Sequence, residues 1–240
     1  MVNIDTVYQR VLILANKEQR GYITPQEFNL YANQAQMEIF EQYFYDLNQA
    51  HRDLGNDTAH ADIDDMLEEK MQIFEDSAIG ETAIATWGNR ADGRKIIPDY
   101  VYRVSRIEVG SVDWDILSTK EFRDAREGSY LVEPTKARPI ANISGNTIGC
   151  ANDTSASGTT PTSVYYFRKP NKVSWGYFVL NAKALYDSAS SKTQHFELHD
   201  SEEAELVYRT LKFAGIGMKR NEIMTAGQGM ESLQTQQEKQ

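Results

Sequence analysis

The sequence contains 240 residues, of which 40% are hydrophobic and 10% aromatic, which is enough to build a substantial core. It carries 35 acidic and 25 basic residues, so its formal net charge is -10. A protein that binds nucleic acid phosphates over a broad surface needs clustered Lys and Arg. This composition therefore argues against a nucleic-acid-binding protein of that kind. An acidic wall past which DNA slides remains compatible with it.

The sequence has one cysteine, Cys150, which excludes an internal disulfide framework and a Cys-rich zinc site. This favours a reducing compartment such as a cytoplasm. The first residues, MVNIDTVYQR, lack a basic start followed by an apolar run, and no stretch approaches the roughly 18 apolar residues of a membrane span. We therefore expect no secretion signal and no membrane partner.

Three amphipathic helices are predicted before the first strand. Asp5 is the expected N-cap of the first helix, and Gly21 ends it. The second helix begins at Thr24-Pro25-Gln26-Glu27, which combines a capping hydroxyl, a proline at the first helical position and a Glu three residues after the cap. The third ends before Gly80. The apolar stripes of the three are Val7, Val11, Leu14 and Ala15; Phe28, Tyr31, Ala35, Ile39, Phe40, Tyr43 and Phe44; and Ile63, Met66, Leu67, Met71 and Phe74.

Strand-forming residues dominate the middle of the chain. A short capped helix is expected from Ser118 to Glu121, and the tract 151–162 has the composition of a loop tip. The predicted strands cover residues 100–104, 107–109, 140–148, 163–167 and 173–179.

Helix is expected again from Asp200, where a cap is followed by acidic residues, to Gly215. The segment 225–240 is rich in Gln and has no apolar stripe, so we expect a flexible C-terminal arm. The order of elements predicts an α+β fold, a helical bundle with an inserted antiparallel β region and an extended C-terminal arm. The expected divisions are helices in 1–95, β insertion in 96–194, a helix completing the bundle in 195–224 and the arm in 225–240.

The string NKEQRGYITPQE, residues 16–27, resembles a calcium loop in part, with Gly21 and Glu27 at the expected places. Arg20 would put a cation where the ion needs an oxygen ligand, and that repulsion outweighs one bidentate Glu. Gly21 is also explained as a helix C-cap, and Thr24 with Glu27 as a capping box. We therefore interpret the string as the corner between two helices.

Other candidate sites have simpler explanations. His195 and His199 have the spacing of a helical metal pair, but Phe196 and Leu198 alternate with polar residues, so we expect both His in an extended segment facing solvent. The acidic residues near the third helix are expected on its wet face; they are Asp62, Asp64, Asp65, Glu68 and Glu69. No catalytic residue, metal site or cofactor is predicted, and 13 Tyr with three Trp favour a binding surface.

The chain also resembles a known class of protein. The stretch from Ser163 to Ile223 resembles the small virion structural proteins of tailed bacteriophages, especially crAss-like and marine short-tailed phages. The segment 7–49 and the entry Ile96-Ile97-Pro98-Asp99-Tyr100 are similar to the same proteins. The motifs that carry the resemblance are Tyr165-Tyr166-Phe167-Arg168-Lys169-Pro170, Trp175-Gly176-Tyr177, Tyr186-Asp187, Phe196-Glu197-Leu198 and Ala214-Gly215-Ile216.

The resemblance is to head-tail connectors, also called adaptor or ring proteins, and it implies a homo-oligomeric ring, commonly a dodecamer, in the virion. Such a ring docks beneath the portal protein, contacts neighbouring tail or ring proteins and passes DNA through its lumen without reading its sequence. It would be assembled in the host cytoplasm. Alternatives are a tail tube, minor capsid or fibre-attachment protein and, more remotely, a metal-dependent enzyme.

In this interpretation the segment 216–240 is an arm that orders when it docks on a partner. Deletion of 225–240 is then expected to leave melting unchanged and to abolish incorporation into virions. The apolar residues expected to bind the partner are Ile216, Met218, Ile223, Met224, Met230 and Leu233.

Overall fold

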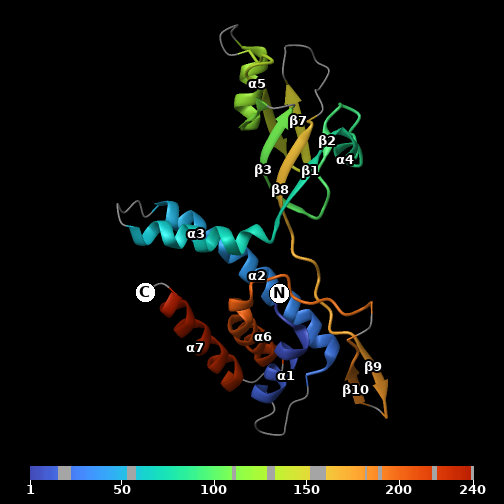
Figure 1. The fold of residues 1–240 in the computed structure, drawn as a ribbon, viewed down its shortest axis with the longest axis vertical. Helices are drawn as coiled ribbons and strands as arrows, with labels where there is room; N and C mark the ends of the chain where they lie inside the picture. The colour runs from blue at the N-terminus through green and yellow to red at the C-terminus, as the bar shows by residue number, and fades with distance from the viewer. Residues whose placement is uncertain are drawn as a thin grey trace. The chain divides into compact units, whose positions relative to one another are not determined.

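The computed structural model of the chain forms two compact units (Figure 1). Residues 1–73 and 170–240 make the helical unit, and residues 74–169 make the β unit. Helices together with antiparallel and mixed sheets confirm the α+β class. The structure describes residues 1–15, 23–52, 58–109, 112–128, 133–151, 161–181, 183–188, 191–217 and 221–238.

The helical unit is built from both ends of the chain. Its core is rich in aromatic residues, and Phe28, Phe40 and Phe196 are fully buried. The central α2 supplies most of the stripe predicted for the second helix, but Met66 of α3, which was expected inside, is 60% exposed. Its elements are α1 (Ile4–Ala15), α2 (Pro25–Arg52), α3 (Thr58–Gln72), β9 (Tyr177–Leu180), β10 (Lys183–Tyr186), the 3-10 helix η2 (Asp200–Glu202), α6 (Glu203–Gly217) and α7 (Asn221–Glu238).

The starts of the first two helices test the capping predictions. The Thr24–Glu27 box is confirmed, because the Glu27 carboxylate accepts from the Thr24 N–H at 3.0 Å and the Glu27 N–H donates to the Thr24 hydroxyl at 3.3 Å. Asp5 is not the cap of α1. The helix begins at Ile4, and the Asn3 side chain accepts from the Asp5 N–H at 2.9 Å, which makes Asn3 the cap.

The β unit contains two four-stranded sheets. One has the order β1-β8-β3-β4 and the other β2-β7-β6-β5. All pairs are antiparallel except β5 with β6, so the expected antiparallel region is mixed at this edge. The elements are β1 (Glu75–Ile79), α4 (Glu81–Ala85), β2 (Lys95–Ile96), β3 (Val101–Val109), β4 (Val112–Asp113), β5 (Asp115–Leu117), α5 (Thr119–Glu127), β6 (Ile140–Ser144), β7 (Thr147–Ala151) and β8 (Ser163–Arg168).

The core of the β unit joins the two sheets around Trp87, Trp114 and Ile107. The capping box expected at Ser118 and Glu121 is present at the start of α5. The single strand predicted for 140–148 is wrong. It is the hairpin β6–β7, because Gly145 adopts a φ of 60° that suits glycine and turns the chain.

Two expected boundaries are also wrong. The third helix ends at Gln72, and residues 75–79 form β1, because Ala78 fits into the buried core and the segment pairs along β8. The compact β unit covers 74–169, and the strands β9 and β10, which lie within the expected insertion 96–194, belong to the helical unit. Residues 173–176 do not form a strand, because the N–H groups of Val173 and Trp175 donate to side chains of α2.

The predicted extended arm is a helix. Residues 221–238 form α7, which packs on α6 in the helical unit. Its alternation of Gln and small residues hid this from the apolar pattern, because Gly227 of α7 and Gly215 of α6 let the two backbones approach closely and give no hydrophobic signal. Within the described parts of the chain, no helix has the length and apolar character needed to cross a membrane.

Candidate assembly surface

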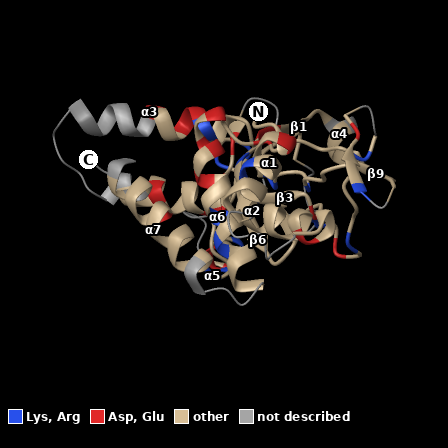
Figure 2. Cartoon of the chain, turned by 90° about the horizontal axis from the view of Figure 1, so that it is seen from below, with Lys and Arg blue, Asp and Glu red and all other residues tan. Residues whose placement is uncertain are grey.

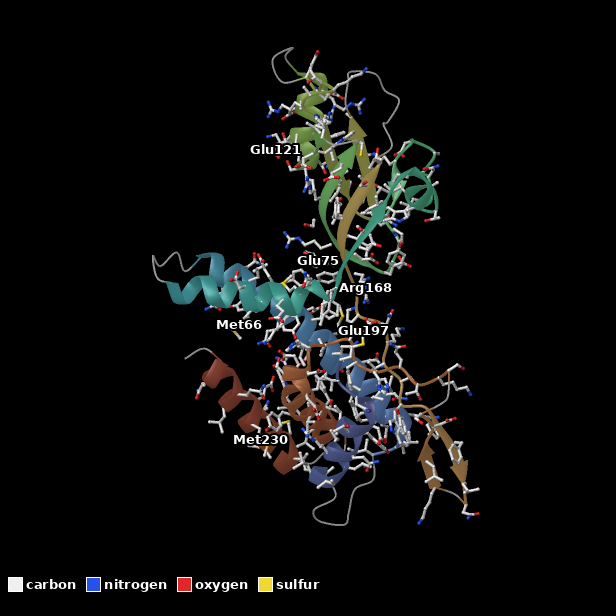
Figure 3. The ribbon with its side chains drawn as sticks, viewed as in Figure 1. Met66, Glu75, Glu121, Arg168, Glu197 and Met230 are labelled. Atoms are coloured by element: carbon white, nitrogen blue, oxygen red, sulfur yellow. The ribbon has the colours of Figure 1, made fainter. Side chains whose placement is uncertain are left out.

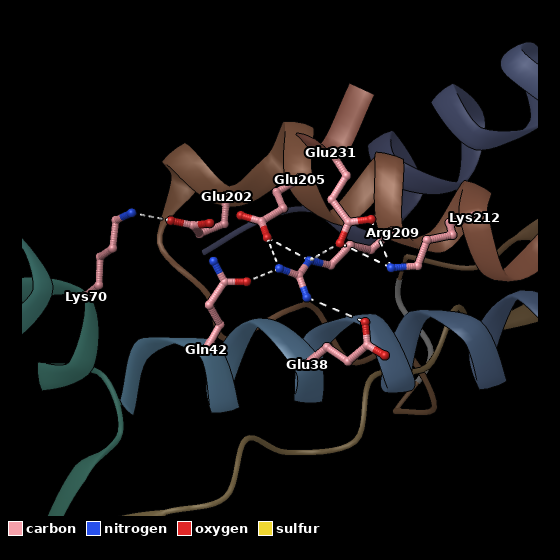
Figure 4. A network of polar contacts seen from close by, with 8 residues as sticks. All are labelled: Glu38, Gln42, Lys70, Glu202, Glu205, Arg209, Lys212 and Glu231. Carbon is pink, nitrogen blue, oxygen red and sulfur yellow. Dashed lines mark hydrogen bonds and ion pairs between the residues drawn. The ribbon is translucent and has the colours of Figure 1, made fainter. Parts of the chain in front are cut away.

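A buried charged cluster holds the last helices to the bundle (Figure 4). Arg209 of α6 is only 6% exposed. Its guanidinium binds Glu205 one turn earlier, with Nε at 2.6 Å from the carboxylate, and donates to Gln42 of α2. Glu38 of α2 lies 3.5 Å away, and Glu231 of α7 lies 3.7 Å away. One side chain therefore joins three helices, and we call this cluster the Arg209 network.

Two further ion pairs extend the Arg209 network. Lys212 of α6 contacts the Glu231 carboxylate at 2.9 Å, so that carboxylate faces two cations from α6. Lys70 of α3 contacts Glu202 at 2.6 Å, and Glu202 is 2% exposed. Because these charges are largely shielded from water, removal of one partner costs more than it would at the surface.

The contact between α6 and α7 depends on glycine. A Cβ on Gly215 would lie 2.6 Å from the Met224 backbone nitrogen, and a Cβ on Gly227 would lie 3.1 Å from the Lys212 backbone. The first distance leaves no space for a side chain, and the second would require the Lys212 backbone to shift slightly. We conclude that α7 is seated on α6 by close backbone packing as well as by charge.

The residues expected to bind a partner are divided by this packing. Ile223 and Met224 are half-buried near α6, whereas Ile216, Met230 and Leu233 remain exposed, and Leu233 most of all at 61%. Figure 3 labels Met230 on α7. Met218 lies outside the described residues. Only the exposed members of the predicted set can meet another molecule without moving α7.

An apolar groove of about 320 Å³ lies between α1, α6 and α7. Ile13, at its edge, is 68% exposed, and Met230 contributes from α7. Its one charged residue, Arg10, is paired with Glu203 at 3.0 Å, so its charge is partly neutralised within the chain. We call this feature the apolar groove. It is lined by Arg10, Ile13, Leu14, Ala204, Val207, Tyr208 and Met230.

The strands β9 and β10 form a separate two-stranded hairpin in the helical unit. Asn181 has a φ of 49°, a left-handed conformation that Asn tolerates and that suits a tight hairpin turn. Trp175 stacks on Tyr177 and Tyr186 with ring centroids 5.7 and 5.8 Å apart, which fixes the base of the hairpin. Phe178, Val179, Leu180 and Leu185 of the hairpin are exposed.

The two histidines do not act together. The His195 Nδ1 accepts from the Ile4 N–H at 3.3 Å, and the His199 Nδ1 accepts from the Ser201 N–H at the start of η2. Both residues lie in an extended segment, as predicted, and are half-buried, so they face solvent only in part. Glu197 between them is buried, and both of its carboxylate oxygens accept from Asn171.

Residues 16–22 of the string NKEQRGYITPQE, which was interpreted as the corner between two helices, lie outside the described part of the chain. The described portion of that string contains the capping box of α2. In the rest of the described chain, no group of three or more His, Cys, Asp or Glu is arranged to hold a metal ion. Burial raises the pKa of Cys150 to about 12.

Charge is unevenly spread within the helical unit. The sequence of α7 has three Glu and no Lys or Arg, whereas 170–194, which carries the hairpin, has three Lys and one Asp. Figure 2 shows α7 without basic residues. A hollow of about 400 Å³ on α2 is also acidic, since Glu38, Glu41 and Asp46 line it. The two ends of the unit therefore differ in electrostatic character.

Comparison of the chain with models of known protein families and with curated proteins finds no match to either. The candidate surface consequently rests on the geometry of the chain and on the resemblance given above.

Sequence reasoning missed several residues that matter here. Arg209 and Glu205 have the spacing of an i, i+4 ion pair, which could have been noticed, although nothing local shows that the pair is buried. Phe178 was predicted within the strand 173–179 with no distinction of face, and Leu180 and Leu185 were assigned to no strand. The alternation in YFVL and KALY could have separated the two faces once the hairpin turn was recognised.

Proposed function

We propose that this protein is a virion structural protein that forms a ring in the head-tail connector of a tailed phage, beneath the portal. The observation that carries the proposal is the two-part organisation, with a helical unit made from both ends of the chain and a β unit inserted between them. That is the layout of the connector proteins which the chain resembles in its motifs.

Charge and surface support the same proposal. A net charge of -10 suits a channel wall that repels DNA phosphates and does not trap a passing genome. Exposed apolar residues on the hairpin and around the apolar groove suit a subunit that is covered by neighbours in an assembly. The partners in this proposal are copies of the chain, the portal protein, adjacent ring or tail proteins, and DNA without sequence preference.

The test is to purify the full chain and measure its assembly by native mass spectrometry and electron microscopy. We expect closed rings of a single size with an open channel, and gold-labelled antibodies against the chain should mark the head-tail junction of the particles that contain it. Open helical tubes would indicate a tail-tube role, and label on the capsid shell or on fibres would indicate the other virion roles. Label absent from particles, or hydrolytic activity abolished by EDTA, would overturn the proposal.

A further inference from the structure

One face of the β9–β10 hairpin presents a group of three exposed apolar side chains. Side chains alternate along a strand, and directly paired residues share a face. Phe178 pairs with Leu185, and Leu180 pairs with Lys183, so these four lie on the same face. The three apolar members are 48%, 41% and 54% exposed for Phe178, Leu185 and Leu180. We call this surface the hairpin face.

The opposite side of the hairpin is anchored at its base, while Val179 nearer the turn is 65% exposed. Tyr177 pairs with Tyr186, and both stack on Trp175. Trp175 in turn contacts Tyr8 of α1 with ring centroids 4.4 Å apart, and its indole N–H donates to Asp5 at 2.9 Å. An isolated two-stranded hairpin is marginally stable in water, so these contacts hold the base while the hairpin face stays presented to solvent.

The apolar groove lies on the other side of α1. Arg10 and Leu14 line the groove, while Tyr8 faces the hairpin base. Residues two apart on an α-helix are separated by about 200° around its axis, so Tyr8 and Arg10 point in nearly opposite directions. Figures 1 and 2 agree, because in both views α1 lies between α7 and the hairpin. A hairpin on one side of its unit is therefore poorly placed to fill its own groove.

We propose that the hairpin face of one copy packs into the apolar groove of a second copy. Three apolar side chains from the hairpin would cover Ile13 and Met230, which are both exposed in the single chain. Because the two surfaces are different and lie on opposite sides of one unit, the contact is heterologous, and repetition gives a closed ring or an open filament. The inference deepens the proposed function, on which it rests for closure into a ring.

Charge favours a second copy as the occupant. Lys183 lies on the hairpin face beside Leu180. The three helices that line the groove, α1, α6 and α7, carry six acidic and three basic residues in sequence, and this excess of negative charge remains although Glu231 is paired with Lys212 and Arg209. The hairpin segment is basic in a chain with a net charge of -10, so its approach to the α7 side of another copy brings opposite charges together. The reverse arrangement, groove against groove, would bring two acidic helices together.

The test is disulfide crosslinking of the full chain. The double variant Leu180→Cys with Ile13→Cys should give a ladder of dimers, trimers and higher species under oxidation. A mixture of the two single variants should stop at dimers, because each chain then has one reactive site. The natural cysteine, Cys150, is buried and should not take part in crosslinking. The matched control is Leu180→Cys with Tyr45→Cys, which is 66% exposed on α2 away from the groove and should give no ladder.

A second measurement uses two adjacent residues on opposite faces. Leu180→Asp should weaken self-association at least about tenfold, since it replaces a buried apolar side chain by a charge in the contact. Val179→Asp, on the other face, should leave association unchanged. Circular dichroism spectra equal to wild type would show that both variants fold.

The outcomes separate this inference from the proposed function. Rings without a Leu180–Ile13 ladder, or equal effects of the two Asp variants, would overturn the hairpin contact and leave the ring intact. A ladder that grows into open filaments absent from virions would support the hairpin contact and overturn the connector. A chain that stays monomeric at every concentration and gives no ladder would overturn both.

Discussion

The helical unit and the β unit are built in opposite ways. The first joins residues from both ends of the chain, and its α2, α6 and α7 meet at the Arg209 network. The second uses one continuous segment, and its core of Trp87, Trp114 and Ile107 is apolar. The contrast teaches that the helical unit joins the two ends of the chain through buried charged contacts, whereas the β unit pairs strands of one continuous segment around an apolar core.

Arg209→Ala should have the largest effect, and that effect should be confined to the helical unit. It removes the guanidinium that faces the buried Glu205, and the loss of one partner from a buried ion pair costs about 3–5 kcal/mol. We expect faster hydrogen exchange in α2, α6 and α7 and unchanged exchange in 74–169, measured by mass spectrometry. Arg138→Ala, which breaks an exposed pair with Asp115, is the control and should change neither. Equal loosening of both units would contradict the division.

Ile107→Ala should destabilise the β unit and leave the helical unit unchanged. Ile107 is fully buried in the β unit, and truncation of such a residue costs about 2–5 kcal/mol. Hydrogen exchange should accelerate in the sheets and stay constant in the helical unit. Ile116→Ala, at a position 41% exposed, should stay within about 0.5 kcal/mol of wild type in urea unfolding.

Substitution of two glycines, one in α6 and one in α7, tests the close packing between these helices. Gly215→Ala would push a Cβ into the backbone of α7 and should destabilise the helical unit by about 1–3 kcal/mol. Gly229→Ala meets nothing within 4 Å in α7 and should stabilise it by up to about 1 kcal/mol, because alanine favours helix. Thermal unfolding measures both. Changes of the same sign would show that α7 does not pack on α6 in solution. That result would agree with the flexible arm expected from the sequence.

Thr24→Ala should have the smallest effect, about 1 kcal/mol, from loss of the α2 cap. The Thr24 hydroxyl and N–H both donate to Glu27 and hold the pKa of that carboxyl below its usual range. A lowered folded-state pKa means that this stabilisation is present above the unfolded pKa and is lost as pH falls through the folded pKa. The difference between wild type and variant should therefore shrink in acid. A constant difference from neutral pH to pH 3 in urea unfolding would contradict this account.

Local signals allowed the sequence to predict some parts of this fold. The capping boxes at Thr24 and Ser118 were correct, because both partners lie within four residues, and the aromatic stripe of α2 follows directly from helical spacing. The start of β1 was missed because its pairing with β8 involves residues about ninety positions away. A helix seated by Gly215 and Gly227 leaves no apolar stripe, so α7 was mistaken for an arm.

The structure changes the result expected for deletion of residues 225–240. Removal of 225–240 takes away Glu231, which contacts Lys212 and Arg209, and Gly227, which packs closely on the Lys212 backbone of α6. A truncated chain should therefore lose stability as well as any partner contact, so its failure to enter particles would not by itself identify a docking arm. Point changes at Met230 and Leu233, which are exposed, are the cleaner probes of contact.

The β unit begins and ends at neighbouring points. The Arg168 N–H donates to the Phe74 carbonyl at 2.8 Å, and β1 pairs along β8 from there. A short turn could bridge that gap, so the whole insertion could be excised, or exchanged for another domain, with little change in the path of the remaining chain. Such a joint lets the insert diversify while the surrounding helices keep their own sequence constraints.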